Sequence, residues 1–239
     1  MPPLVSAILV TRDRPVFVRQ ALRCFAAQTY ANRELVVVDD GALPVKALCT
    51  GVPKVRYHRL LTSTSTGTKL NLGIALAGGS ILQKWDDDDF YGRHFLSLSV
   101  KHLLADRLPR TLVTWCCFAV AIAGDPTLYF SGHRWNTGGT LCFHRSLWEE
   151  GPFRDCYASS DSWFIRDHRP RIVRVCAPEQ YILVRHGWNT WRRLKGHDSV
   201  EGYFRRRPFP KSLGAVVGSD HLPFYHSLMT GSANFDASS

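Results

Sequence analysis

Residues 80–91 read SILQKWDDDDFY and place four consecutive aspartates, the aspartate run at 86–89, directly after a short apolar stretch. Residues 80–85 are typical of a buried strand, so the carboxylates stand where that strand ends. In a compact fold, like charges at this density raise one another's pKa unless a cation compensates them. The stretch therefore predicts a divalent cation site, and carboxylate oxygens favour Mn2+ or Mg2+. A solvated acidic turn is the alternative interpretation.

Two upstream segments also end in polar groups. Residues 5–11 (VSAILVT) and 34–39 (ELVVVD) are continuous apolar runs of the kind buried in parallel sheets. They lead to Thr11 and to the pair Asp39 and Asp40. Because the carboxyl ends of parallel strands meet at one edge of a sheet, we expect these side chains to share a cleft with the aspartate run.

The segments between these strands have helical spacing. An apolar stripe predicts an amphipathic helix over 15–28, and a second helix is predicted over 65–77, after a strand over 55–60. This β-α-β alternation predicts an α/β fold with one mostly parallel, Rossmann-like sheet flanked by helices.

The second half of the chain has a less regular pattern. A helix is predicted over 93–106, followed by one long strand over 111–123. The last 35 residues, from Arg205, look loop-rich. Because no internal repeat or linker is present, a single domain with a mixed second half is predicted. Its shorter elements are expected to be strands at 128–130, 140–144, 172–175 and 181–185 and helices at 146–150 and 161–167.

The composition is that of a folded protein. The chain has 239 residues, of which 45% are hydrophobic and 21% charged. Its longest uncharged stretches, 70–83 and 111–124, are shorter than the roughly 20 residues that a membrane-spanning helix needs. The N-terminus has no basic region ahead of its apolar run, so no signal peptide and a cytoplasmic location are predicted.

The chain is basic, with a formal net charge of +10. Residues 164–239 hold 12 basic and 6 acidic side chains, so the C-terminal part carries most of the excess. This balance favours an anionic partner, which can be nucleic acid, a lipid surface or a phosphate-bearing substrate.

The seven cysteines have no C-x-x-C spacing. We interpret them as small buried apolar side chains in a reducing compartment, and expect neither zinc nor a disulfide framework. They are Cys24, Cys49, Cys116, Cys117, Cys142, Cys156 and Cys176.

A metal held by few carboxylates keeps coordination positions open for substrate phosphates, so a leaving diphosphate is implied. The sequence contains neither G-x-x-x-x-G-K-[ST] nor G-x-G-x-x-G. This absence argues against a P-loop enzyme and a dinucleotide-dependent dehydrogenase.

Five stretches, taken in order, resemble family 2 glycosyltransferases of the GT-A fold. The similar stretches are VSAILVTRDRP (5–15), ELVVVDDG (34–41), GTKLNLGIALAGGSILQKWDDDDFYG (67–92), GGTLCFHRSLWEEGPF (138–153) and SSDSWF (159–164). The resemblance implies a nucleotide-binding half over 1–107, an acceptor-binding half over 108–204 and a C-terminal tail over 205–239. It also implies a nucleotide-sugar donor, with a UDP-sugar favoured, and a hydroxyl-bearing acceptor such as a glycan or a lipid-linked sugar.

The same resemblance suggests roles for individual residues in donor binding. Thr11, Asp39 and Asp40 would hold the base and ribose, and Lys69 would face the diphosphate. Asp86 and Asp88 match the two aspartates of the family's D-x-D motif. Asp88 is then the expected metal ligand, Asp86 a further ligand or, with Asp87, a ribose contact, and Asp89 the aspartate that often follows. Leu70 departs from the family's K-R-N pattern, which has arginine there.

On the acceptor side, Asp161 falls where the family places its general base, which removes the proton of the acceptor hydroxyl during inverting displacement. Judged by spacing alone, an aspartate at a helix start can equally be an N-cap. His186 matches a position that in some GT-A enzymes supplies a metal ligand, although a structural histidine is the other interpretation. Trp188, Asn189 and Trp191 can contact a sugar or pack in the core.

Two alternatives stay open. A sugar nucleotidyltransferase also needs a carboxylate-bound metal, but its glycine-rich N-terminal loop is missing here. A non-catalytic module would use the basic tail, Arg192, Arg193, Lys195 and 205–207, to bind anionic membrane or nucleic acid. Nucleic acid is disfavoured, since an arginine-rich composition produces such clusters by itself. Peripheral contact with the inner membrane face is compatible with either an enzyme or a binding module.

Overall fold

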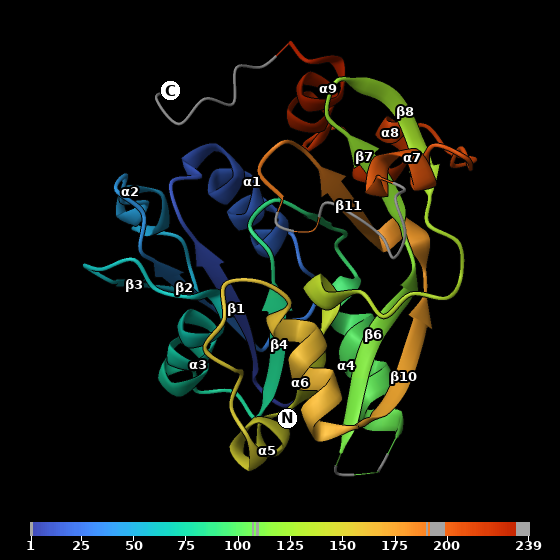
Figure 1. Cartoon of the computed structure of the whole chain (residues 1–239). Coiled ribbons are helices and arrows are strands. Elements are labelled where there is room, and N and C mark those ends of the chain that lie inside the picture. The colour runs from blue at the N-terminus through green and yellow to red at the C-terminus, as the bar shows by residue number, and fades with distance from the viewer. Residues whose placement is uncertain (1, 107, 109, 190, 192–198, 233–239) are drawn as a thin grey trace.

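The computed structural model describes residues 2–106, 108, 110–189, 191 and 199–232 (Figure 1). Its larger sheet has seven strands in the order β10-β6-β9-β4-β1-β2-β3. Neighbouring strands are parallel except at β9, which runs antiparallel to β4 and β6. The predicted mostly parallel α/β sheet is thus confirmed. The strands are β1 (Val5–Thr11), β2 (Arg33–Asp39), β3 (Val55–Arg59), β4 (Ile81–Trp85), β6 (Thr111–Cys117), β9 (Cys142–His144) and β10 (Arg171–Cys176).

Both faces of this sheet are covered, which explains its continuous apolar runs. In β1, Ala7 and Leu9 face the core under α1 and α4, whereas Ile8 faces a second core under α3, α5 and α6. Figure 1 shows the latter three helices in front of the sheet. Successive residues of the central strands β1 and β2 therefore bury side chains on both faces, as in doubly wound folds. The helices are α1 (Pro15–Ala26), α2 (Lys46–Cys49), α3 (Thr66–Leu76), α4 (Phe95–Ala105), α5 (Arg145–Glu150) and α6 (Ser160–His168).

The predicted long strand over 111–123 is wrong. The chain leaves the large sheet after β6 and enters a second, four-stranded sheet, with Phe118 between the two strands. The same crossing occurs from β10 to β11 by way of the short helix η2 (Pro178–Gln180). The second sheet has the order β5-β11-β7-β8, with β5 (Phe90–Tyr91), β7 (Ala119–Ile122), β8 (Asp125–Phe130) and β11 (Tyr181–Arg185).

The segment from Arg205, which was expected to be loop-rich, contains two helices. After α7 (Val200–Phe204) come α8 (Leu213–Val217) and α9 (Leu222–Thr230). Tyr225, Leu228 and Met229 of α9 are buried in the larger core, at a helical spacing that the sequence analysis missed. Among the described residues, no helix has both the length and the apolar character needed to cross a membrane.

Candidate active site

A cavity of about 840 Å3 lies at the C-terminal ends of β1 and β4. The aspartate run, Thr11 and Lys69 line it. Its lining also includes residues 135–139, which contain part of the short helix η1 (Gly138–Thr140), and the start of α6 with Asp161. The predicted convergence of strand ends on one cleft is therefore present for β1 and β4, whereas Asp39 and Asp40 at the end of β2 do not line the cavity.

Asp88 is the most heavily contacted carboxylate at the cavity. Its Oδ2 accepts hydrogen bonds from Arg14 Nη1 at 3.0 Å and Asn189 Nδ2 at 3.3 Å, and it lies 3.0 Å from His186 Nε2. Burial by itself raises the pKa of Asp88, but the hydrogen bond from His186 and the positive charge of Arg14 outweigh it and lower the pKa below its usual value. Asp88 is thus held in its charged form.

Two neighbours of Asp88 have partners of their own. Asp87 Oδ2 accepts a hydrogen bond from Thr11 Oγ1 at 2.7 Å, and Asp87 Oδ1 lies 2.9 Å from Arg14 Nη1. Asp86 Oδ1 pairs with Lys84 Nζ at 2.5 Å. Burial raises the pKa of both carboxyl groups, and the charges of Lys84 and Arg14 only partly offset it.

The last member of the run, Asp89, is buried. It accepts hydrogen bonds from the hydroxyl of Tyr181 and from the backbone N–H of Val184, the latter at 2.9 Å. Burial and the charges of Asp88 and Asp86 raise its pKa well above the usual value. Asp89 therefore joins the aspartate run to β11.

The structure places the predicted metal ligands in two groups. Asp88 and His186 are together, whereas Asp86 is held by Lys84. In the described part of the chain, no set of three carboxylate or imidazole groups brings its ligand atoms within 4.8 Å of one another. His186 is nearly buried and stacks on Phe17 with 4.8 Å between ring centroids.

The predicted nucleotide-binding residues differ in accessibility. Lys69 Nζ donates to Asp40 Oδ1 at 2.7 Å, and Arg12 binds the same carboxylate. Burial raises the pKa of Asp40, but the hydrogen bonds from Arg12 and Lys69 outweigh it and lower the pKa below its usual value. Lys69 lines the cavity, whereas the carboxylate of Asp40 is fully covered.

Asp39 is completely buried and does not line the cavity. Its carboxylate accepts hydrogen bonds from the N–H groups of Gly41 and Val45, at 2.9 and 3.0 Å, and from Tyr57 at 2.8 Å. Leu70, at the position where the family has arginine, is also buried and packs in the second core.

Asp161 lies in the first turn of α6 and lines the same cavity as the aspartate run. Its Oδ1 accepts a hydrogen bond from the N–H of Ser162 at 2.8 Å. Its Oδ2 packs against Gly138, where an added Cβ would lie 1.3 Å away. At the next position, an added Cβ on Gly139 would lie 2.6 Å from Asp86 Oδ2. The two glycines therefore let the carboxylates of Asp161 and Asp86 approach η1.

Sequence reasoning missed Arg14 and Gly138 as site residues. Both stand in stretches that resemble the family, VSAILVTRDRP and GGTLCFHRSLWEEGPF. The adjacent glycines 138 and 139 were the sequence signal that could have pointed to this part of the site. Of the three candidates for sugar contact, Trp191 and Asn189 line the cavity, whereas the backbone oxygen of Trp188 accepts a hydrogen bond from Arg14 at 2.8 Å.

The predicted basic tail lies only partly within the described structure. Arg192, Arg193 and Lys195 fall outside the described residues. Arg205 is described, and it pairs with Asp125 at 3.0 Å.

The sheet order and the cavity at its strand ends define an α/β fold of the GT-A type, and comparisons with solved structures agree. Residues 1–349 of S. aureus TarS in complex with UDP-GlcNAc superpose with a TM-score of 0.61 at 15% identity, covering 77% of this chain and 59% of that one. The mannosyltransferase PcManGT from Pyrobaculum calidifontis in complex with GDP-Man and Mn2+ gives 0.62 at 15% identity, covering 97% and 74%.

Sequence comparison identifies the family. The model of glycosyl transferase family 2 matches residues 6–151, more than half of the chain, and the chain belongs to this family. An uncharacterized glycosyltransferase of Haemophilus influenzae is 26% identical over 114 residues, which are 46% of this chain and 46% of the relative. The matched regions span less than half the length of the curated relatives.

Proposed function

We propose that the chain transfers a sugar from a nucleotide-diphosphate sugar to a hydroxyl acceptor with inversion at the anomeric carbon. One observation carries the proposal: Asp161 and the aspartate run line the same cavity. Inverting displacement needs a base on the acceptor side and compensation of negative charge on the side of the leaving group. Family membership and neighbours solved with UDP-GlcNAc or GDP-Man support this class of donor.

The nucleotide would occupy the first half of the chain. Thr11 and Lys69 line the cavity and are available to the ribose and diphosphate. Asp40 would become available when Arg12, which is 38% exposed at its side chain, swings away from it. Hydrogen-bond donors already surround the carboxylate of Asp39, which orders the turn after β2. Asp39 would therefore affect binding of the nucleobase indirectly, by positioning that turn.

The donor set fits a divalent cation. Asp88 offers a charged carboxylate and His186 an imidazole nitrogen beside it, and Asp86 is the third candidate. Mn2+ and Mg2+ are often bound by one or two protein carboxylates together with substrate phosphates. When bound, such a cation would stabilise the negative charge of the leaving diphosphate. The structure of PcManGT with Mn2+ supports the choice of metal.

Asp161 would take the proton of the acceptor hydroxyl. The N–H of Ser162 holds one oxygen of its carboxylate, and the bare Cα of Gly138 leaves room for the other. Trp191 and Asn189 lie on the same cavity and can position the acceptor by stacking and hydrogen bonding.

The test measures release of nucleoside diphosphate from a panel of nucleotide sugars, with and without Mn2+. We expect Asp161→Asn to lower kcat by about 10²- to 10⁴-fold, as loss of a general base does. Asp88→Asn should remove the response to Mn2+. Asp167→Asn, on the same helix as Asp161 but paired with Arg154 at the surface, is the matched control and should retain activity.

Two results would argue against the proposal. Full activity of Asp161→Asn would exclude the base role. Release of pyrophosphate from a nucleoside triphosphate and a sugar phosphate would instead favour nucleotidyl transfer.

A further inference from the structure

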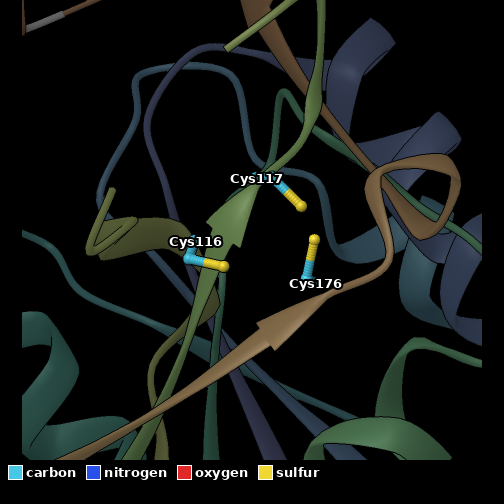
Figure 2. A group of neighbouring side chains, drawn as sticks. All are labelled: Cys116, Cys117 and Cys176. Carbon is cyan, nitrogen blue, oxygen red and sulfur yellow. The ribbon is translucent and has the colours of Figure 1, made fainter. Parts of the chain in front are cut away.

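Three cysteines gather at the point where the chain passes from the large sheet to the small one. Cys116 and Cys117 end β6, and Cys176 ends the neighbouring strand β10. Their sulfur atoms all lie within 4.8 Å of one another, and Figure 2 shows the three side chains turned toward a common space. All three are free thiols.

A register shift in the β6–β10 pairing explains how adjacent cysteines come together. Val175 pairs with Trp115, but Cys176 pairs with Cys117, so Cys116 has no partner residue in the ladder. In a regular strand, adjacent side chains point to opposite faces. An extra residue in one strand disrupts this alternation and redirects a side chain. The shift therefore allows Cys116 and Cys117 to approach the same thiol.

A fourth side chain lies beside one of these thiols. His133 belongs to the loop after β8, and its Nδ1 lies 3.7 Å from Cys176 Sγ. The loop is tied to the end of β6, because the N–H of Trp135 donates to the backbone oxygen of Cys116 at 3.2 Å. His133 is exposed, and so is Cys176, so the group is open to solvent.

We propose that Cys116, Cys117, Cys176 and His133 form a binding site for a thiophilic divalent cation of the Zn2+ class. A tetrahedral zinc ion with ordinary Zn–S and Zn–N bonds holds its ligand atoms about 3.6 Å apart. The distance from Cys176 to His133 already matches this spacing. Binding would require side-chain rotations that bring the other two sulfurs and His133 to the same spacing. Binding releases the thiol protons to solvent, since the ligands are thiolates.

This site differs in chemistry and position from the cavity. Thiolates select zinc-like ions, whereas the carboxylates of the aspartate run favour Mn2+ or Mg2+. The members of the group come from two strands and a distant loop, so they have no C-x-x-C spacing by which the sequence could reveal them. Because the three sulfur atoms lie so close together, these cysteines are not isolated apolar side chains.

The position of the site indicates what the cation would do. Phe118, next to Cys117, lines the cavity, and so do residues 135–139, which follow His133. A cation shared by β6, β10 and this loop would fix the acceptor-side wall of the cavity. Binding to the folded state alone also raises stability.

The test uses the full chain, reduced, freed of metal and titrated with Co2+. Thiolate ligation gives a sulfur-to-cobalt charge-transfer band that carboxylate ligation at the aspartate run cannot give. We expect this band to appear, to disappear on addition of Zn2+, and to be lost in Cys176→Ser. Cys156→Ser changes a partly exposed cysteine elsewhere, and this matched control should keep the band.

His133→Ala is a second variant that changes only an exposed side chain. We expect this variant to keep a weaker band. Its affinity for the metal should fall by at least roughly 10- to 100-fold, which is the loss typical for a residue that only supports a ligand. Zn2+ should protect Cys176, the exposed thiol of the group, from alkylation and raise the melting temperature. Absence of the band, or an equal band in Cys176→Ser, overturns the proposal, and so does an unchanged number of reactive thiols.

Discussion

The carboxylate of Asp161 occupies the space that a side chain at position 138 would fill. A Cβ added to Gly138 would lie 1.3 Å from Asp161 Oδ2. Because glycine alone lacks this atom, the residue at 138 determines where the proposed base can stand. The glycine is therefore as much a part of the site's geometry as the aspartate.

Gly138→Ala should impair catalysis without unfolding the protein. The clash is with the end of a partly exposed side chain, which can rotate into solvent. The base would then be displaced, so we expect kcat to fall by about 10²-fold or more while KM for the donor stays near the wild-type value. Steady-state kinetics and the melting temperature measure both effects.

The matched control is Gly214→Ala in α8, where an added Cβ makes an ordinary contact of 3.5 Å with Leu222. It should leave kcat unchanged. If Gly138→Ala kept the wild-type kcat, the packing of Asp161 on Gly138 would have no catalytic importance.

The first half of the fold could be predicted because each of its strands and helices is recognisable from its own residues. Strands β1 and β2 are largely apolar runs that end in a polar group, β4 leads directly into the aspartate run, and the helices between the strands have their own spacing. The division of residues 111–123 could not be predicted, since the stretch is continuously apolar. Pairing with β10 and β11, far along the chain, decides where β6 ends and β7 begins.

The site was predictable to a similar degree. Thr11, Asp88 and Asp161 stand in recognisable stretches, and the structure places all three on the cavity. The contact of Arg14 with Asp87 and Asp88 depends on how two strand ends meet, which no local pattern encodes. The cysteine group is hidden for the same reason.

Arg14 is expected to compete with the metal. Its guanidinium bridges Asp87 and Asp88 at 2.9 and 3.0 Å, so a cation at Asp88 must displace it or share the carboxylate. Arg14→Gln should therefore increase the apparent affinity for Mn2+ and lower the melting temperature without metal, because buried carboxylates lose their partner. Thermal unfolding across a series of Mn2+ concentrations measures both changes.

Arg12→Gln serves as the matched control, because Arg12 pairs with Asp40 and not with the aspartate run. Its response to Mn2+ should equal that of the wild type. An Arg14→Gln protein with unchanged or weaker Mn2+ binding would show that the guanidinium does not occupy the position of the cation.

Glu34 makes the stability of the sheet depend on pH. Its Oε1 accepts hydrogen bonds from Ser6 Oγ and from the N–H of Gly78, both at 2.6 Å, and its Oε2 lies 3.3 Å from Arg56. Burial raises the pKa of Glu34, but these hydrogen bonds and the charge of Arg56 outweigh it and lower the pKa. The folded state therefore binds a proton less readily than the unfolded state, whose glutamate has a pKa of about 4.3.

The stabilisation from Glu34 should be complete well above that unfolded value and be lost as pH falls through the lower, folded pKa. Glu34→Gln should reduce the free energy of unfolding at pH 7 by about 1 to 2 kcal/mol. The difference from the wild type should shrink as the pH is lowered below about 5. Urea denaturation at a series of pH values measures this difference in the free energy of unfolding, and Glu149→Gln, at an exposed position, is the control. A difference that stays constant or grows on acidification would mean that the charge of Glu34 does not stabilise the fold.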